Sequence, residues 1–197
     1  QDFRLRAKYA LPSIRRKGAL LVGRGDEEEL IEERTVSELE GLPSRGPNDD
    51  RDDSLYVGFG FQGFEQGARG LDYSIGVKVR SSPELYAKSS YHQGWNLSAK
   101  DYVRFRPILY WKSDEGVGST LTVEYDRLIG DAMLLRWGNF GNISEDSDVD
   151  GVAWGESLSL FQVLSKRRAL TYRVFVSGET GNEVPVKNYG VEFRYRQ

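Results

Sequence analysis

The sequence predicts an all-β fold, an antiparallel up-and-down transmembrane β-barrel formed by one domain over residues 1–197. Apolar and polar side chains alternate along most of the chain, and this period of two is typical of strands. In the segment DYVRFRPILYWK, for example, Phe105 falls on one face while Arg104 and Arg106 fall on the other. Helical periodicity is almost absent outside one acidic segment, so strands are expected to form the whole domain.

Eleven alternating segments, each bounded by turn residues, are the expected strands. The alternation is clearest in SLYVGFGF, LDYSIGVKV, LTVEY and TYRVFV. In chain order the expected strands are 3–11, 18–25, 54–64, 71–81, 84–93, 101–112, 117–127, 131–141, 152–164, 168–178 and 186–196.

Most connections, such as NLSAKD, LIGD and SKRR, are short, so neighbours in the sequence are expected to pair as antiparallel neighbours in space. The exception is a long acidic loop at 25–53, and loops of this length are usually functional or disordered. Single-chain bacterial barrels have even strand numbers, and eleven is odd. We therefore expect about 12–14 strands in the closed barrel, some of them from outside this sequence.

Composition limits the function classes before any site is considered. The chain is 39% hydrophobic and 12% aromatic with 22 glycines, which suits half-polar strands joined by Gly-containing turns. It has no cysteine, which excludes disulfides, thiolate catalysis and Cys-ligated metal. The net charge of -3 is not basic, so no nucleic-acid partner is expected. No apolar run reaches the roughly 18 residues of a transmembrane helix, whereas membrane strands need only every second residue to be apolar.

The two faces of the predicted strands fit two opposite arrangements. In a soluble barrel or sandwich the apolar face points inward, whereas in a membrane barrel it points to lipid. Tyr and Trp recur near the strand ends of the apolar face, as in aromatic girdles, and the apolar residues exceed what one small core needs. We therefore expect the charged face to lie in the lumen. The expected lumen-lining residues are Arg4, Arg6, Lys8, Lys78, Arg80, Arg104, Arg106, Glu124, Asp126, Arg136, Arg173, Glu192 and Arg194.

Several stretches of the chain carry a resemblance to a known family. LLRWGNFGN, WGESLSLFQVLSKRRALTYRVFVSGET and VPVKNYGVEFRYR, all within Leu134–Arg196, resemble an uncharacterised proteobacterial outer-membrane β-barrel protein family. ALLVGRGDEEE is similar to that family's first hairpin. The resemblance implies a barrel fold and a location in the bacterial outer membrane, and it brings no catalytic motif.

The charged face supports two interpretations of the lumen. If its Arg and Lys side chains line a water-filled pore, that pore should favour anions. Alternatively, they pair with Glu124, Asp126, Glu156 and Glu192 and fill the lumen with ion pairs. We predict a non-enzymatic outer-membrane barrel that acts as a narrow channel or as a structural or partner-binding subunit of an envelope assembly. Its expected partners are outer-membrane lipid and lipopolysaccharide, together with another envelope protein or a second copy of itself.

A lipid-modifying hydrolase that uses the single histidine, His92, is an alternative function. Ser90 and His92 share one strand face in KSSYHQGW, but the sequence identifies neither an orienting acid nor oxyanion donors. A structural, lumen-facing histidine is the simpler interpretation. A soluble lipophile-binding barrel is the second alternative.

The most specific short motif is SEDSDVDG, in which Asp146, Asp148, Asp150 and Gly151 follow the opening pattern of a calcium loop. A serine occupies the position of the closing bidentate carboxylate, and a glutamate comes one residue too early. A solvated acidic loop is the other interpretation. Calcium is the one cofactor that the sequence suggests.

The connections also predict an orientation in the membrane. Those after even-numbered strands are longer and more acidic than those after odd-numbered strands. Because outer-membrane barrels carry long loops outside and short turns on the periplasmic side, the acidic connections are expected to be extracellular. There they could share divalent cations with lipopolysaccharide phosphates.

Overall fold

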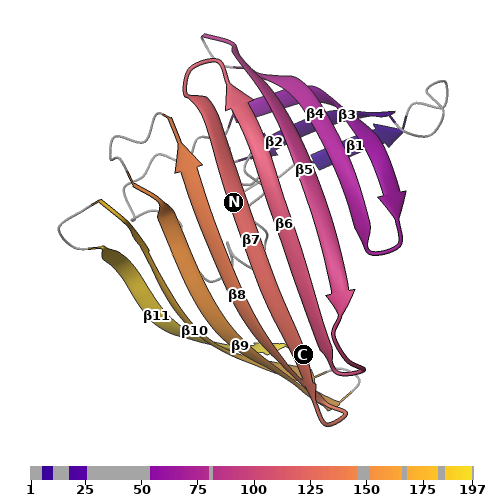
Figure 1. The fold of residues 1–197 in the computed structure, drawn as a ribbon, viewed down its shortest axis with the longest axis vertical. Coiled ribbons are helices and arrows are strands. Elements are labelled where there is room, and N and C mark those ends of the chain that lie inside the picture. Colours follow the sequence, from indigo (N-terminus) through magenta and orange to yellow (C-terminus); the bar gives the residue numbers. More distant parts are fainter. Residues whose placement is uncertain are drawn as a thin grey trace.

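The computed structural model of the protein describes residues 6–10, 18–25, 54–79, 82–145, 151–165, 168–181 and 185–196, with side chains from Leu55 onward. These residues form one sheet of eleven strands, each antiparallel to the next, in an order that follows the chain. The strands are β1 (Arg6–Ala10), β2 (Gly18–Gly25), β3 (Ser54–Gln66), β4 (Arg69–Val79), β5 (Glu84–Asn96), β6 (Asp101–Lys112), β7 (Gly116–Ile129), β8 (Met133–Ser144), β9 (Ala153–Ser165), β10 (Arg168–Glu179) and β11 (Val186–Arg196). The predicted all-β, antiparallel, up-and-down architecture is confirmed (Figure 1).

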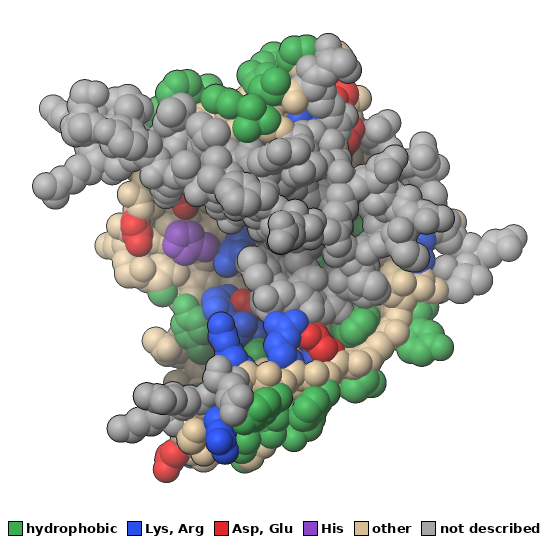
Figure 2. Space-filling view, turned by 180° about the vertical axis from the view of Figure 1, so that it is seen from behind, with side chains coloured by type: hydrophobic (Ala, Val, Ile, Leu, Met, Phe, Trp, Pro, Cys, Tyr) green, Lys and Arg blue, Asp and Glu red, His purple; other side chains and the backbone are tan. Residues whose placement is uncertain are grey.

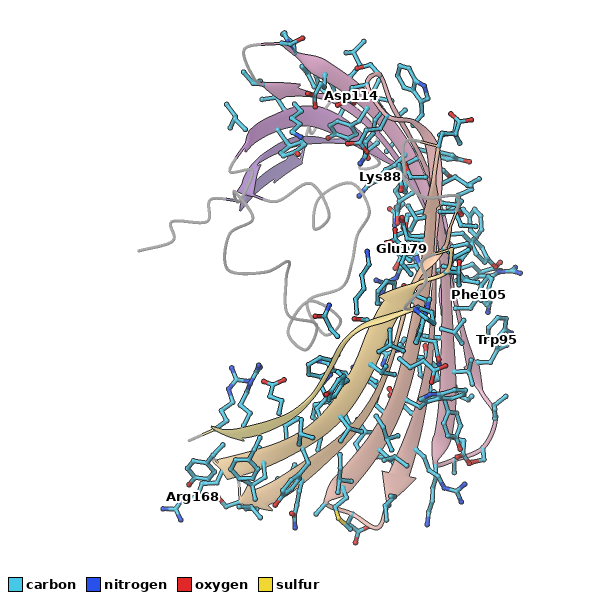
Figure 3. All side chains as sticks on the ribbon, turned by 90° about the vertical axis from the view of Figure 1, so that its left-hand side faces the viewer. Lys88, Trp95, Phe105, Asp114, Arg168 and Glu179 are labelled. Atoms are coloured by element: carbon cyan, nitrogen blue, oxygen red, sulfur yellow. The ribbon has the colours of Figure 1, made fainter. Side chains whose placement is uncertain are left out.

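The sheet is strongly curved and open over the described residues. Seen from the side, it forms an open C with β1 near one end and β11 at the other (Figure 3). In this part of the chain β1 and β11 do not pair with each other, so the predicted closed barrel and its strand number stay predictions. No helix long and apolar enough to cross a membrane is found among the described residues.

Several strands run further than predicted because their pairing continues to the turn itself. β3 and β4 are joined by a turn of two residues, Gly67 and Ala68. Gly67 has a φ of 63°, in the left-handed region that a two-residue hairpin turn favours. β5 likewise extends to Asn96, beyond the predicted end at residue 93.

A bulge in β3 keeps one face of that strand apolar. Gln62 pairs with Asp72 and Phe64 pairs with Leu71, which leaves Gly63 as the extra residue. If Gly63 paired as an ordinary strand residue, the period of two would turn Phe64 to the polar face. The bulge therefore preserves the segregation of the faces up to the turn.

The convex face of the sheet is apolar and exposed, and the concave face is polar. Phe105 and Trp95 lie on the convex side, whereas Lys88 lies on the concave side (Figure 3). Among the described residues 29 large hydrophobic side chains are exposed, and only Tyr56, Tyr86, Ile108 and Tyr110 are buried. Twelve polar or charged side chains are buried, mostly Ser, Thr, Lys and acids. This distribution is the reverse of that in a soluble domain.

Rings on the concave face lie over glycines of neighbouring strands. A Cβ atom added to any of these glycines would meet the aromatic side chain, so a larger residue there would require the neighbouring atoms to shift. The pairs are Tyr86 over Gly58 and Gly76, His92 over Gly70, Tyr102 over Gly94, Tyr110 over Gly118, Phe140 over Gly155 and Phe175 over Gly190. Glycine beneath a ring lets large side chains crowd the inner side of a curved sheet.

Candidate functional site: the charged concave face

Charged side chains gather on the concave face, where they form the candidate functional site. Figure 2 looks toward this side and shows Lys and Arg side chains near the single histidine in the hollow, with apolar side chains along the outer edge. Pairing across the sheet explains the gathering, because residues directly opposite one another share a face. One row of partners crosses five strands on this face. It contains Asp126, Arg136, Ser159, Arg173 and Glu192.

Two arginines and two carboxylates form a closed network on β6, β7 and β8. Asp126 accepts a hydrogen bond from Arg104 Nη2 at 2.6 Å and two from Arg136, from Nε at 2.7 Å and Nη2 at 3.0 Å. Glu124 completes the network at 2.9 Å from Arg104 Nε and 3.6 Å from Arg136 Nη1. The side chains of Glu124 and Asp126 are only 7% and 12% exposed. Each carboxylate therefore contacts both guanidinium groups, and Arg136 binds Asp126 as a bidentate fork.

A second cluster, made of lysine and tyrosine, lies on the same face toward the β4 to β5 connection. The Lys78 and Lys112 side chains are 2% and 4% exposed. Lys78 Nζ lies 5.9 Å from the ring centre of Tyr56, and Lys112 Nζ lies 5.2 Å from that of Tyr110. Each ammonium also meets a carboxylate, that of Glu84 at 3.4 Å or Glu115 at 2.7 Å. These buried charges are thus held by ring faces and by ion pairs.

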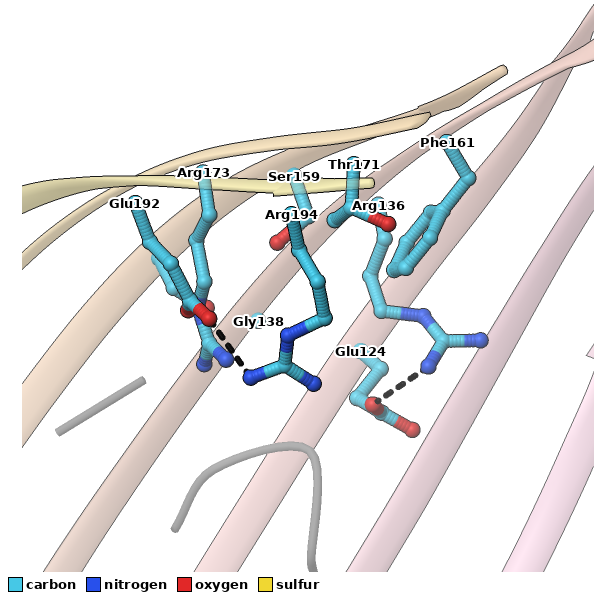
Figure 4. Close-up of a pocket in the computed structure, with 10 residues that line it drawn as sticks. Glu124, Arg136, Gly138, Ser159, Phe161, Thr171, Arg173, Glu192 and Arg194 are labelled. Carbon is cyan, nitrogen blue, oxygen red and sulfur yellow. Dashed lines mark hydrogen bonds and ion pairs between the residues drawn. The ribbon is translucent and has the colours of Figure 1, made fainter. Parts of the chain in front are cut away.

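A cavity of about 140 Å³ opens on the concave face between the charge network and β11 (Figure 4). It is lined by Glu124, Arg136, Gly138, Ser157, Ser159, Phe161, Thr171, Arg173, Glu192 and Arg194. Sequence reasoning named the charged members of this set. It missed the serines, the threonine and Phe161. Alternation places them on the polar face, but only the register between strands shows that they meet at one cavity.

The predicted lumen-lining residues share the concave face wherever their side chains are described. These are Lys78, Arg104, Arg106, Glu124, Asp126, Arg136, Arg173, Glu192 and Arg194. Arg6 and Lys8 lie in β1, and their side chains fall outside the described part, as do Arg4 and Arg80 altogether. Whether the concave face is a lumen stays a prediction, because the sheet is open.

Glu156 was predicted among the ion-pair partners of the lumen, and this prediction is wrong. It pairs with Asn139 of β8 and Val176 of β10, in the row that contains Phe105 and Val123 on the convex face. Successive residues of a strand face opposite sides, and Glu156 directly precedes Ser157, which lies on the concave face. Glu156 is an exposed carboxylate on an otherwise largely apolar surface.

His92 lies on the concave face, and its ring covers Gly70. Ser90 shares this face and is 6% exposed, and Asp72 pairs with Ser90 across β4 and β5. An acid is therefore near, which the sequence did not reveal. Ser90 and His92 are two residues apart on this face. The alternative of a hydrolase that uses His92 stays a prediction.

The calcium prediction concerns Asp146, Asp148 and Asp150, which lie outside the described residues. Elsewhere in the described chain no group of three or more His, Asp or Glu side chains is placed to hold a metal ion. The prediction of calcium at this loop therefore stays a prediction.

Comparison with protein-family models and with curated proteins found no match to this chain. The resemblance to an outer-membrane barrel family therefore stays an expectation drawn from the sequence. The features of the chain that bear on its function are the apolar convex face, the polar concave face and the charged side chains of the concave face.

Proposed function

We propose that this chain forms most of the wall of a membrane-integral β-barrel in the bacterial outer membrane, with a charged interior and no enzymatic activity. The observation that carries the proposal is the reversed distribution of side chains, with 29 large hydrophobic residues exposed and charged residues buried. Soluble monomers rarely expose apolar patches above a few hundred Å². In a membrane, contact with lipid would make the exposed apolar side chains of the convex face energetically favourable.

The concave face supports an aqueous interior over a lipophile-binding one. A carrier of an apolar ligand needs apolar side chains on the inside of its barrel. Here the inside holds the network of Arg104, Glu124, Asp126 and Arg136, together with buried Lys78 and Lys112. We therefore favour a narrow channel, with a structural or partner-binding subunit as the other role of the same barrel.

Strand parity bears on how such a barrel closes. Each strand is antiparallel to the next, so β1 and β11 run in the same direction. An all-antiparallel closure therefore requires an odd number of strands in addition to the eleven described, which gives an even total. This agrees with the expected closed barrel of about 12–14 strands.

Reconstitution tests the proposal directly. The protein should need detergent to stay monodisperse, should migrate differently on gels with and without heating, and should give small single-channel conductances in planar bilayers. A protein that remains monomeric without detergent would overturn the membrane assignment. Detergent dependence without conductance would reject the channel and leave the structural role. His92→Ala should have no effect in any of these measurements.

A further inference from the structure

The cavity on the concave face has a floor of very small side chains. Gly138 pairs with Ser157, and Ser159 lies two residues further along β9 on the same face. A Cβ atom added to Gly138 would meet only Ser157 Oγ, at 3.3 Å. The space above this floor is therefore open because no large side chain begins there, and a cavity of about 140 Å³ is large enough for several water molecules.

Arginines stand on both sides of this floor. Ser159 pairs with Arg136 on β8 and with Arg173 on β10, so it lies between them. Two strand spacings separate these arginines, which places their backbones roughly 10 Å apart. Arg194 on β11 reaches over the floor from the Arg173 side (Figure 4). One small group above the floor can therefore be approached by guanidinium groups from two directions.

The arginines are held in place by contacts of their own. Arg136 is fixed by Asp126 and Glu124, and its guanidinium carbon lies 5.6 Å from the ring centre of Phe161. Arg173 is buried, at 8% exposed. Arg194 donates a hydrogen bond to Glu192 at 2.5 Å, and its side chain is 47% exposed. Restricted arginines such as Arg136 and Arg173 lose little freedom when a ligand binds, which favours recognition.

The chemistry of the lining selects an anion that accepts several hydrogen bonds. Three arginines and two glutamates line the cavity. With Arg104 and Asp126, which contact Glu124 and Arg136, the count is four arginines and three carboxylates, an excess of one positive charge. The hydroxyls of Ser157, Ser159 and Thr171 add neutral donors around the same space. Arginine forks and hydroxyls together are the donors that phosphate and similar oxyanions accept.

We propose that this cavity is a binding site for a small phosphate-type oxyanion, taken from the water-filled side of the sheet. The site lies on the concave face that we propose as the barrel interior, so it rests on that proposal. It does not require the barrel to conduct ions.

Calorimetric titration of inorganic phosphate into the detergent-purified full chain, at constant ionic strength, tests the site. Wild type should bind with one saturable heat. Arg194→Gln should weaken phosphate binding at least about tenfold, because it removes one hydrogen bond to a charged group. Ser157→Leu, which fills the floor and leaves every charge in place, should abolish binding.

Arg196→Gln is the matched control, because Arg196 lies two residues from Arg194 on the same face of β11 and outside the cavity lining. It should change the affinity less than twofold. Equal weakening by both arginine variants would show diffuse charge attraction and overturn the site, as would the absence of saturable heat in the wild type.

Titration with acetate in the same buffer distinguishes phosphate-type anions from carboxylates as ligands. Equal or tighter acetate binding would assign the site to carboxylates and overturn the phosphate assignment. Heat-modifiable migration of each variant establishes that it is folded.

Discussion

Asp126 is the residue on which the concave ion pairs converge. Its two carboxylate oxygens accept hydrogen bonds from Arg104 and from both sides of the Arg136 fork. It thereby links β6, β7 and β8 through side chains as well as through the backbone. A carboxylate shared by two guanidinium groups neutralises charges that would otherwise repel one another across β7, on β6 and β8.

Asp126→Asn should therefore destabilise the protein by about 2 kcal/mol, because it leaves two partly buried arginines with less negative charge. The value lies below that for a fully buried pair, since the Arg104 and Arg136 side chains are 34% and 21% exposed. Urea unfolding of the refolded protein in detergent measures the change. The control is Lys187→Gln, which removes the exposed pair with Glu179 and should cost under about 0.5 kcal/mol. Equal costs for the two variants would contradict a specific role for Asp126.

At the scale of the strand, glycines beneath rings let the concave face pack tightly. The ring of Tyr110 lies over Gly118, and the residue is 3% exposed. Its hydroxyl oxygen accepts a hydrogen bond from Asn142 Nδ2 at 3.0 Å. Because the ring is enclosed and held, Gly118→Ala should destabilise the sheet by about 1–3 kcal/mol through overpacking. The same urea experiment measures it.

Gly141→Ala is the matched control on β8. A Cβ atom at Gly141 would meet only Val152 Cγ1, at an ordinary 3.7 Å. This variant should be neutral or slightly stabilising, because it reduces the freedom of the unfolded chain. If both alanine variants cost the same, the ring over Gly118 is not what restricts that position.

The exposed apolar side chains of the convex face predict that lipid surrounds the strands. Val174 is 47% exposed near the middle of β10, and Val117 is 50% exposed at the start of β7. In a bilayer, arginine should cost about 2–4 kcal/mol at the depth of Val174 and about 0–1 kcal/mol at Val117. Reversible unfolding in phospholipid vesicles compares Val174→Arg with Val117→Arg. Equal, small costs would indicate that both residues face water.

For the whole molecule, the sequences that connect the strands differ in charge between two sets. The connections after even-numbered strands contain 19 acidic and four basic residues, whereas those after odd-numbered strands contain one acidic and six basic residues. The first set is 26–53, 80–83, 113–115, 145–152 and 180–185; the second is 11–17, 67–68, 97–100, 130–132 and 166–167. In the meander, the strand ends that flank each set lie at one rim, so we expect the imbalance in the sequence to become a difference in charge between the two ends of the sheet.

Epitope tags inserted after Asp114 and after Gly67 therefore report the orientation. We expect the Asp114 tag, at the acidic rim, to be labelled in intact cells, since long loops of outer-membrane barrels face outward. The Gly67 tag should be labelled only after permeabilisation. The reverse result would place the acidic rim in the periplasm and remove the expected contact with lipopolysaccharide. Labelling of both tags in intact cells would contradict a membrane-spanning sheet.

Much of the fold could be predicted from the sequence, because a period of two assigns each side chain to a face without knowledge of its neighbours. Phe105 and Arg104 were separated in this way, and so were the predicted lumen-lining residues whose side chains are described. Glu156 was the exception, since it was chosen by charge against its own parity. The strand order also followed from the sequence, because short connections leave a strand no partner except the next one.

Only the tertiary structure decided which concave residues meet. Ser159 comes between Arg136 and Arg173 because of the register across β8, β9 and β10, and register depends on turns and bulges far from these residues. The ring of Tyr110 lies over Gly118 because of the register between their strands. Local alternation is a property of each strand and is written in its sequence. The cavity, the ion-pair network and the ring and glycine pairs are properties of neighbouring strands, so they appear only when backbone hydrogen bonds fix one strand against the next.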